Sequence, residues 1–144
     1  MTRKEILEKY KKDANLRNAE NLPLSFKSDL NILKFQKGKI RAFKYLNGNK
    51  SPYEHIEYKI GKTYICKDFD DDERKLCSKG YNVATLDWCL RDTNYDLSKT
   101  YIIVEFEAKD IVAIPYNSDG KFRVKKMKIV RKLTQKEKEK WIKK

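Results

Sequence analysis

Two of the chain's three cysteines, Cys77 and Cys89, lie in the stretch CSKGYNVATLDWCLRD at residues 77–92. A cysteine becomes a nucleophile when a base lies nearby in space, and the single histidine, His55, stands in SPYEHIEYK, far along the chain. The cysteine spacings, counted from Cys66, fit neither a disulfide framework nor a zinc knuckle. Whether a cysteine of this chain acts as a nucleophile therefore depends on whether residues 77–92 form a catalytic site or a buried structural joint.

The pattern within this stretch favours a joint. Leu86, Cys89 and Leu90 stand at helical spacing, which predicts a short helix with one buried face. Cys89 on that face would behave as a small hydrophobe. Gly80 can supply the positive φ of a tight turn. The residues expected to have structural roles are Cys77, Gly80, Trp88 and Cys89, together with Pro115, which ends the buried strand DIVAIP.

Other sequence features give little support to catalysis. The acidic run 68–73 could offer oxygens to a hard cation, but it lacks the EF-hand spacing and is interpreted as a solvated loop. The chain has no glycine-rich phosphate loop and no paired-histidine motif. We therefore expect no catalytic residue, no metal and no cofactor. A cysteine- or metal-dependent enzyme is the weaker alternative.

Charge is the strongest compositional signal. The formal net charge is +13 over 144 residues, with 34 basic and 21 acidic side chains. The excess is concentrated at the two ends: residues 1–50 hold 13 basic and 5 acidic side chains, residues 101–144 hold 13 and 6, and residues 51–100 hold 8 and 10. Such a distribution predicts a defined basic face that binds nucleic acid or a ribonucleoprotein. Solubility alone is the competing explanation.

The residues predicted to form this face come from both ends of the chain. They are Lys4, Lys11, Lys12, Arg17, Lys39, Arg41, Lys44, Arg123, Lys125, Lys126, Lys128, Arg131 and Lys132. Aromatic side chains are interleaved with them in places, as single-strand stacking would require. However, no RRM or KH motif is present, and aromatics at strand spacing are more often part of a core.

These residues must be positioned by an α+β fold. We expect an N-terminal helical arm over residues 1–37, with one helix over 2–18 and a weaker helical segment over 25–36. Residues 38–133 should form a compact, mostly antiparallel sheet with one inserted short helix. A basic C-terminal helix over 134–144 should begin with a capping box formed by Thr134 and Glu137.

Alternation of apolar residues sets the expected faces of the strands. Ile40 and Ala42 should point inward from KIRAFKYL, and TYIIVEFE should bury Ile102, Val104 and Phe106. The segment HIEYKIGKTYICK is interpreted as two short strands around Gly61. The final strand, FRVKKMKIV, changes phase near residues 125–126, which predicts a bulge there.

The order of two motifs resembles the C-terminal domain of bacteriophage rIIB-like proteins over roughly residues 38–133. The matching positions are Cys77, Gly80, Val83, Ala84, Thr85, the run DIVAIP at 110–115, and Val124. The chain departs from the family at Tyr81 and Asn82, where a histidine usually follows the glycine turn. The resemblance implies a phage or prophage origin and a shared β-rich domain. It implies no reaction, since the family is associated with lysis control and protection against host exclusion.

These observations together predict a phage-encoded, non-catalytic binding protein. The expected partner is a host defence protein or ribonucleoprotein complex, inhibited stoichiometrically in the manner of an anti-CRISPR protein. The alternative is a general accessory protein that binds DNA or RNA directly in lysis control or gene expression. The N-terminus lacks the apolar stretch of a signal peptide, and no run approaches the ~18 apolar residues of a membrane span. The expected location is the host bacterial cytoplasm, without membrane contact; the oligomeric state is left open.

Overall fold

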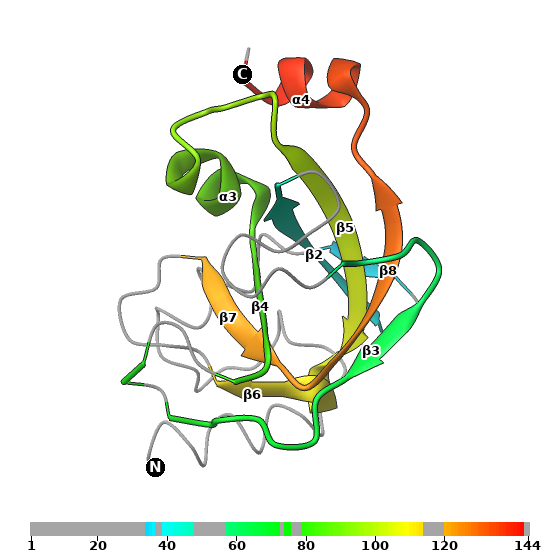
Figure 1. The fold of residues 1–144 in the computed structure, drawn as a ribbon, viewed down its shortest axis with the longest axis vertical. Helices are drawn as coiled ribbons and strands as arrows, with labels where there is room; N and C mark the ends of the chain where they lie inside the picture. The colour runs from blue at the N-terminus through cyan, green and yellow to red at the C-terminus, as the bar shows by residue number, and fades with distance from the viewer. Residues whose placement is uncertain are drawn as a thin grey trace.

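The computed structural model describes residues 34–36, 39–47, 57–72, 74–75, 79–113 and 120–142 (Figure 1). The helix expected over residues 2–18 lies outside these ranges, as do Lys4, Lys11, Lys12, Arg17, His55, Glu73, Cys77 and Pro115. No helix in the described ranges has the length and apolar character needed to cross a membrane.

Eight antiparallel strands and two short α-helices make up the described fold, which confirms a sheet-dominated α+β class. The strands are β1 Lys34–Gln36, β2 Lys39–Leu46, β3 Thr63–Ile65, β4 Tyr81–Ala84, β5 Thr100–Glu107, β6 Ile111–Ala113, β7 Lys121–Val124 and β8 Lys126–Lys132. The helices are α3 Leu86–Asp92 and α4 Gln135–Ile142, and the 3-10 turn η2 spans Ala108–Asp110. The strand order is β3-β8-β5-β2-β4-β7-β6, with β1 paired to β2.

The expected helical arm is wrong at its C-terminal end. Residues 34–36 form β1, whose Phe35 lies opposite Ile40 of β2 in an antiparallel hairpin. Helical spacing alone could not detect this pairing, because a short segment takes its conformation from its neighbour when a sheet edge is available. The sheet therefore begins inside the region assigned to the arm.

β2 is the central strand, and its alternation is as predicted. It pairs with β5 along its whole length, from Lys39 opposite Glu107 to Leu46 opposite Thr100. Ile40, Ala42 and Leu46 are buried on its inner face. From β5, the predicted inward residues Ile102, Val104 and Phe106 join the same core.

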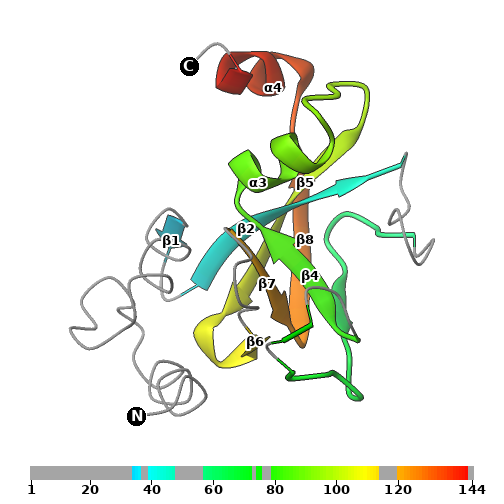
Figure 2. The same cartoon turned by 90° about the vertical axis from the view of Figure 1, so that its left-hand side faces the viewer.

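The sheet is curled, so that strands far apart in the strand order contact each other across the interior. Phe106 of β5 and Phe122 of β7 make an edge-to-face contact with ring centroids 5.6 Å apart, although two strands separate them in the sheet. Tyr64 of β3 similarly approaches Tyr81 of β4 at 6.3 Å. Figure 2 shows β4 and β7 lying in front of β5 and β8. The core cluster is enclosed between these two portions of the sheet.

The predicted phase change falls at Lys125, which separates β7 from β8. Phe122 and Val124 are buried before it, and Met127 and Ile129 after it. The Lys125 N–H donates to the Asp110 carbonyl at 2.8 Å, and the Lys125 carbonyl accepts from the Cys66 N–H at 2.8 Å. Lys125 thus fixes a corner at which the chain passes from one side of the sheet to the other.

Residues 77–92 form a structural joint in their described part, as predicted. Thr85 caps α3, its hydroxyl accepting from the Trp88 N–H at 3.1 Å, a contact that contributes about 1 kcal/mol in typical helices. Leu86, Cys89 and Leu90 are buried against the outer face of the sheet, beside Tyr101. Trp88 lies at the edge of this cluster, with the Lys121 ammonium over its ring at 5.2 Å.

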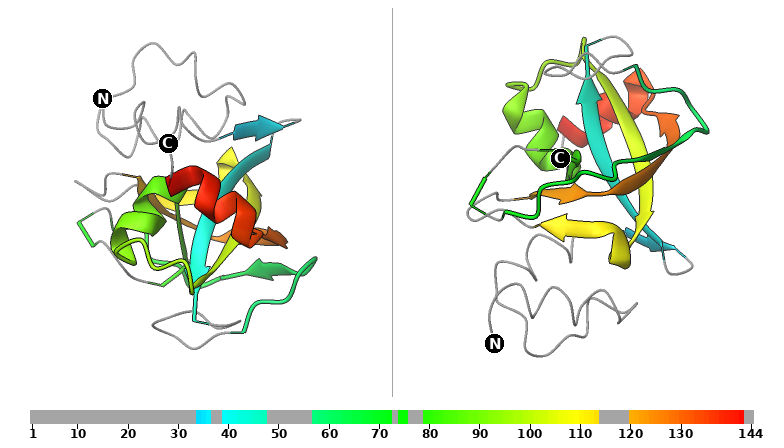
Figure 3. Two further views of the ribbon diagram at one scale, coloured as in Figure 1. Left: turned by 90° about the horizontal axis from the view of Figure 1, so that it is seen from above. Right: turned by 60° about the horizontal axis from the view of Figure 1, so that its bottom comes forward.

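The C-terminal helix α4 begins with the predicted capping box. The Glu137 N–H donates to the Thr134 hydroxyl at 3.2 Å, and the Thr134 N–H donates to the Glu137 carboxylate at 3.1 Å. Lys138 anchors the helix to the loop after α3, donating to the carbonyls of Leu97 at 2.8 Å and Lys99 at 3.2 Å. Figures 1 and 3 show α3 and α4 at the same end of the sheet.

The prediction that Arg123 contacts a partner is wrong, because its side chain is fully buried. The guanidinium donates to the carbonyls of Asp70 at 2.6 Å and Lys75 at 2.8 Å, with a longer contact of 3.4 Å to that of Asp72. Bonds from a charged donor are worth roughly 1.5–3 kcal/mol each. Arg123 therefore ties the acidic segment that follows β3 to the middle of β7.

Gly80 makes room for this arginine. Its φ is +127°, and a Cβ at this position would lie 2.8 Å from the Arg123 Cγ and 3.0 Å from the Cδ. Because the guanidinium is held by carbonyls on several residues, the arginine stem cannot move aside cheaply. The glycine is thus required both by its backbone conformation and by the packing around it.

We expect Gly80→Ala to lower the free energy of unfolding by about 3 kcal/mol, through combined backbone strain and overpacking. Gly61→Ala is the matched control, since Gly61 also has a positive φ, +84°, but a Cβ there meets nothing within 4 Å. The control should lose only about 1 kcal/mol. Equal losses in urea denaturation of the two variants would show that Arg123 does not restrict Gly80.

Candidate interaction surface

The structure divides the predicted basic residues into internally paired ones and ones that remain available. Lys39 and Arg41 both reach Glu105 of β5, at 3.5 Å and 3.0 Å. Lys44 points toward the carbonyl of Asn82 and lies over the Tyr58 ring, 5.7 Å from its centroid. These three side chains stabilise the sheet, and interactions within the fold already largely compensate their charges.

Arg131 is also engaged internally. Its guanidinium forms a bidentate pair with Glu137, at 2.7 Å and 3.0 Å, so the last strand is tied to the cap of α4. The hydrogen bonds from Arg131, followed by the Thr134 N–H, lower the pKa of the Glu137 carboxyl to about 2. Arg131 thus holds α4 in place, and its charge is not available to a partner without breaking this pair.

Lys126 and Lys128 differ from this group. They alternate with buried Met127 and Ile129 along β8, so both extend from its outer face. Neither forms an ion pair within the described part of the chain. Their cross-strand neighbours on β3 are Ile65 and Thr63. The outer face of these two strands therefore presents unneutralised ammonium groups next to an exposed edge strand.

Sequence reasoning missed three further lysines at the same place. Lys59, Lys62 and Lys67 flank or precede β3, are exposed, and form no ion pair among the described residues. Residues 59–67 contain these three lysines and no acidic residue, and residues 125–132 contain five basic residues and none that is acidic. The shared absence of acidic residues is a sequence signal, but it becomes visible only when β3 is known to pair with β8.

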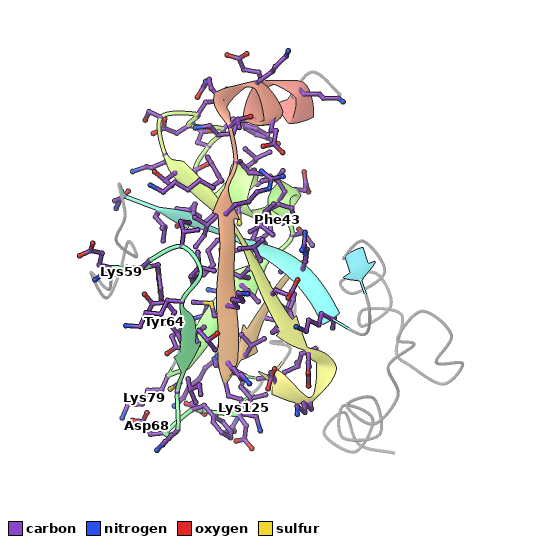
Figure 4. The ribbon with its side chains drawn as sticks, turned by 90° about the vertical axis from the view of Figure 1, so that its right-hand side faces the viewer. Phe43, Lys59, Tyr64, Asp68, Lys79 and Lys125 are labelled. Carbon is purple, nitrogen blue, oxygen red and sulfur yellow. The ribbon has the colours of Figure 1, made fainter. Side chains whose placement is uncertain are left out.

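We call the five unneutralised side chains the β3–β8 lysine face; they are Lys59, Lys62, Lys67, Lys126 and Lys128. Figure 4 looks onto β8 and β3, with Lys59 and Tyr64 along one side of β8 and Lys125 at its lower end. None of the five ammonium groups forms an ion pair within the described fold, and Glu105, the cross-strand neighbour of Lys128 on β5, is paired with Lys39 and Arg41. Together the five groups produce a positive potential that attracts anionic partners and accelerates their association.

Apolar side chains are exposed within the same region. Ile65 is 62% exposed, Ile60 51% and Phe69 37%. The Lys125 ammonium lies over the exposed Phe69 ring at 5.8 Å, and the Lys62 ammonium lies at 5.1 Å from the ring of Tyr64, which is half-buried and packs against the core. Exposed apolar side chains with a polar rim mark interaction sites, and here the rim is positively charged.

Lys132, which was also predicted for the basic face, is exposed at the end of β8, beyond the residues that pair with β3. Lys125 is half-buried at the corner between β7 and β8. The residues predicted to act together are thus separated by the fold: Lys126 and Lys128 belong to the lysine face, Lys125 borders it, and the others described are paired, buried or distant.

The described cysteines show no catalytic arrangement. Cys89 is buried, as its helical spacing predicts, and burial raises the pKa of its thiol to about 12, so the thiol remains protonated at neutral pH. Cys66 is half-buried, with its Sγ 3.4 Å from a carboxylate oxygen of Asp68. Neither environment favours a thiolate nucleophile.

The acidic segment after β3 is neutralised by its own neighbours. Asp68 pairs with Lys79 at 3.1 Å, Asp70 with Lys75 at 3.2 Å, and Asp72 with Arg74 at 3.0 Å. Hydrogen bonds from Lys79 hold the pKa of Asp68 below its ordinary value. Within the described ranges, no three metal-ligating side chains converge as a metal site would require. The segment is therefore structured by local pairs and by Arg123.

Comparison of the chain with protein-family models, curated proteins and solved structures finds no match.

Glu137→Gln should weaken the docking of α4 in a pH-dependent manner. Because the folded pKa of Glu137, about 2, lies below its ordinary value of 4.5, the stabilisation is complete above pH 4.5 and is lost as the pH falls toward 2. The variant should therefore be less stable than the parent at neutral pH, and the difference should shrink below pH 4.5. Urea denaturation across this range measures it.

Glu139→Gln, on the same helix, is the control. The difference in unfolding free energy between this variant and the parent should not shrink as the pH falls below 4.5. A constant difference between the Glu137→Gln variant and the parent at all pH values would contradict the assigned role of the Arg131 pair.

Proposed function

We propose that the protein is a non-catalytic binding protein that docks on its partner through the β3–β8 lysine face. The observation that carries the proposal is the concentration of five exposed, unneutralised lysines in the segments that flank β3 and on β8. Elsewhere in the described fold, the side chains of Lys39, Arg41 and Arg131 form ion pairs with carboxylates. An uncompensated cluster repels itself and destabilises the fold, so its presence favours a role in binding.

The partner that suits this surface best is a host ribonucleoprotein of a defence system, bound stoichiometrically in the manner of an anti-CRISPR protein. Such a complex has both anionic nucleic-acid grooves and protein surfaces, which match the lysines and the exposed apolar side chains respectively. The resemblance to rIIB-like proteins supports a phage origin and action in the host cytoplasm. Cys89, inert in the core, gives no support to an enzymatic mechanism.

Charge reversal on the lysine face tests this proposal. The double substitution Lys126→Glu and Lys128→Glu should reduce capture of the partner from lysate of a phage-permissive host by about tenfold or more, since attraction is replaced by repulsion. Lys136→Glu with Lys140→Glu is the matched control: it makes the same change in net charge on exposed positions of α4. Capture is quantified by mass spectrometry, with and without nuclease.

A single stoichiometric complex that survives nuclease and is lost only in the β8 variant supports the inhibitor function. Equal capture by both variants would remove the lysine face as the docking surface. Capture of nucleic acid alone, abolished by nuclease, would favour the second function considered below.

Direct binding of single-stranded RNA or DNA is the second candidate function. It is favoured by the exposed ring of Phe69, which lies at the edge of the same face with the Lys125 ammonium 5.8 Å from its centroid. This ring can stack with a base, and lysines can neutralise phosphates. This arrangement would give affinity without sequence specificity.

If this second function holds, binding of oligouridine should be steeply salt-dependent. With five lysines contacting phosphates, log K should fall with log salt with a slope of about −3.5, and the Lys126→Glu, Lys128→Glu variant should flatten that slope by at least about 1.4. Fluorescence anisotropy at several salt concentrations measures the slope. A slope near zero, or one unchanged in the variant, would exclude this function for the lysine face.

A further inference from the structure

The edge of β3 has main-chain groups that point away from the sheet. Lys62 accepts from the Ile129 N–H at 3.0 Å, and the Cys66 N–H donates to the Lys125 carbonyl at 2.8 Å. Bonded and non-bonded residues alternate in an antiparallel ladder, so Thr63 and Ile65, between these bonded positions, direct their N–H and C=O groups away from β8. Within the described part of the chain these outward groups have no partner.

The edge strand itself, Thr63–Ile65, contains no charged residue and no proline; its protection against pairing comes from its short length and from the flanking Lys62 and Lys67. Natural sheet edges are blunted by charge, proline or bulges, because an open apolar edge templates pairing with another chain. Here Ile65 is 62% exposed at the end of the edge strand, and Ile60 is 51% exposed just before the strand. An exposed isoleucine beside unpaired main-chain groups is the composition of a strand-addition site, where main-chain bonds give affinity and side chains give specificity.

The surrounding charge selects the strand that can be added. Lys128 and Lys126 stand on the same face as Thr63 and Ile65, as their cross-strand neighbours, and Lys62 lies directly before the edge. A second copy of the chain would bring the same lysines and a net charge of +13 into apposition, which is repulsive. An extended segment with acidic residues on the facing side would be attracted, because lysine side chains reach across neighbouring strands.

We propose that the β3 edge accepts an extended acidic segment of the partner protein as an added β-strand. Thr63 and Ile65 supply the main-chain hydrogen bonds, Ile65 supplies apolar contact, and Lys126 and Lys128 pair with the acidic side chains. This inference rests on the proposed function, since it uses the β3–β8 lysine face, and it specifies which component of the partner is recognised. A nucleic acid has no polypeptide main chain to continue a sheet, so the open edge favours a protein segment.

The test uses a synthetic peptide of about eight residues, an ordinary strand length, that alternates valine or threonine with glutamate. A peptide with lysine in place of glutamate is the charge control, and oligouridine is the nucleic-acid comparison. Ile65→Pro removes the outward N–H but no bond to β8, and proline is tolerated on an edge where its nitrogen faces away from the sheet. Thr63→Pro makes the equivalent change at the other outward position.

We expect each proline variant to bind the acidic peptide about tenfold more weakly than the parent, the consequence of losing a main-chain hydrogen bond at an interface. Ile65→Thr, which keeps the N–H and remains a good strand former, should lose about threefold or less. The lysine-containing peptide should not bind. Binding is measured by isothermal titration calorimetry, after circular dichroism has shown that each variant retains the parent's fold.

The outcomes separate this inference from the proposed function. Equal peptide binding by Ile65→Pro and Ile65→Thr, with loss in the Lys126→Glu, Lys128→Glu variant, would overturn strand addition and leave the lysine face intact. Failure of the parent to bind the acidic peptide would also overturn strand addition, whatever lysate capture gives. Oligouridine binding that is insensitive to both proline variants, without peptide binding, would identify nucleic acid as the occupant and overturn the proposal.

Discussion

The buried guanidinium of Arg123 donates to main-chain carbonyls of the segment that follows β3, at distances of 2.6 Å to Asp70 and 2.8 Å to Lys75. A buried charge is costly unless it is hydrogen-bonded, and here the two terminal nitrogens of the guanidinium make these bonds while its Nε has no hydrogen-bond partner among the described residues. Loss of the bonds to the segment would leave the charge buried and unsatisfied, so they hold the segment against β7. Gly80 is required because a Cβ would meet the arginine stem at 2.8 Å. The chain runs directly from β3 into this segment. The position of β3 beside β8, at the edge of the sheet, therefore depends on the hydrogen bonds of Arg123 and on the corner at Lys125.

The distribution of charge follows from the same framework. Several carboxylates form ion pairs within the fold. Glu105 pairs with Lys39 and Arg41, Glu137 pairs with Arg131, and the acidic segment after β3 is neutralised by basic residues close to it in sequence. The five side chains of the β3–β8 lysine face form no ion pair within the described fold. A high net charge alone is explained by solubility, whereas its concentration beside exposed isoleucines is the reason we propose this surface as the docking site.

Features with a local cause were predicted well from the sequence. The helix from Leu86 to Asp92, the capping box at Thr134 and the inward faces of β2 and β5 depend on spacing within a few residues, and the structure confirms them. The burial of Arg123 could not be predicted, because its partners lie about fifty residues away and are main-chain carbonyls, which carry no sequence signature. The lysines around β3 were missed for the same reason: their meaning depends on the pairing with β8.

The central claim is that the surface of β3 and β8, rather than the lysine-rich helix α4, is where an anionic partner binds. Chemical-shift perturbation of the isotope-labelled protein, titrated separately with the acidic peptide and with oligouridine, tests this residue by residue. The account predicts that the perturbed amides cluster at residues 62–66 and 125–129, with those of Lys136 and Lys140 unchanged. Perturbations centred on α4, or spread evenly over all exposed lysines, would contradict it.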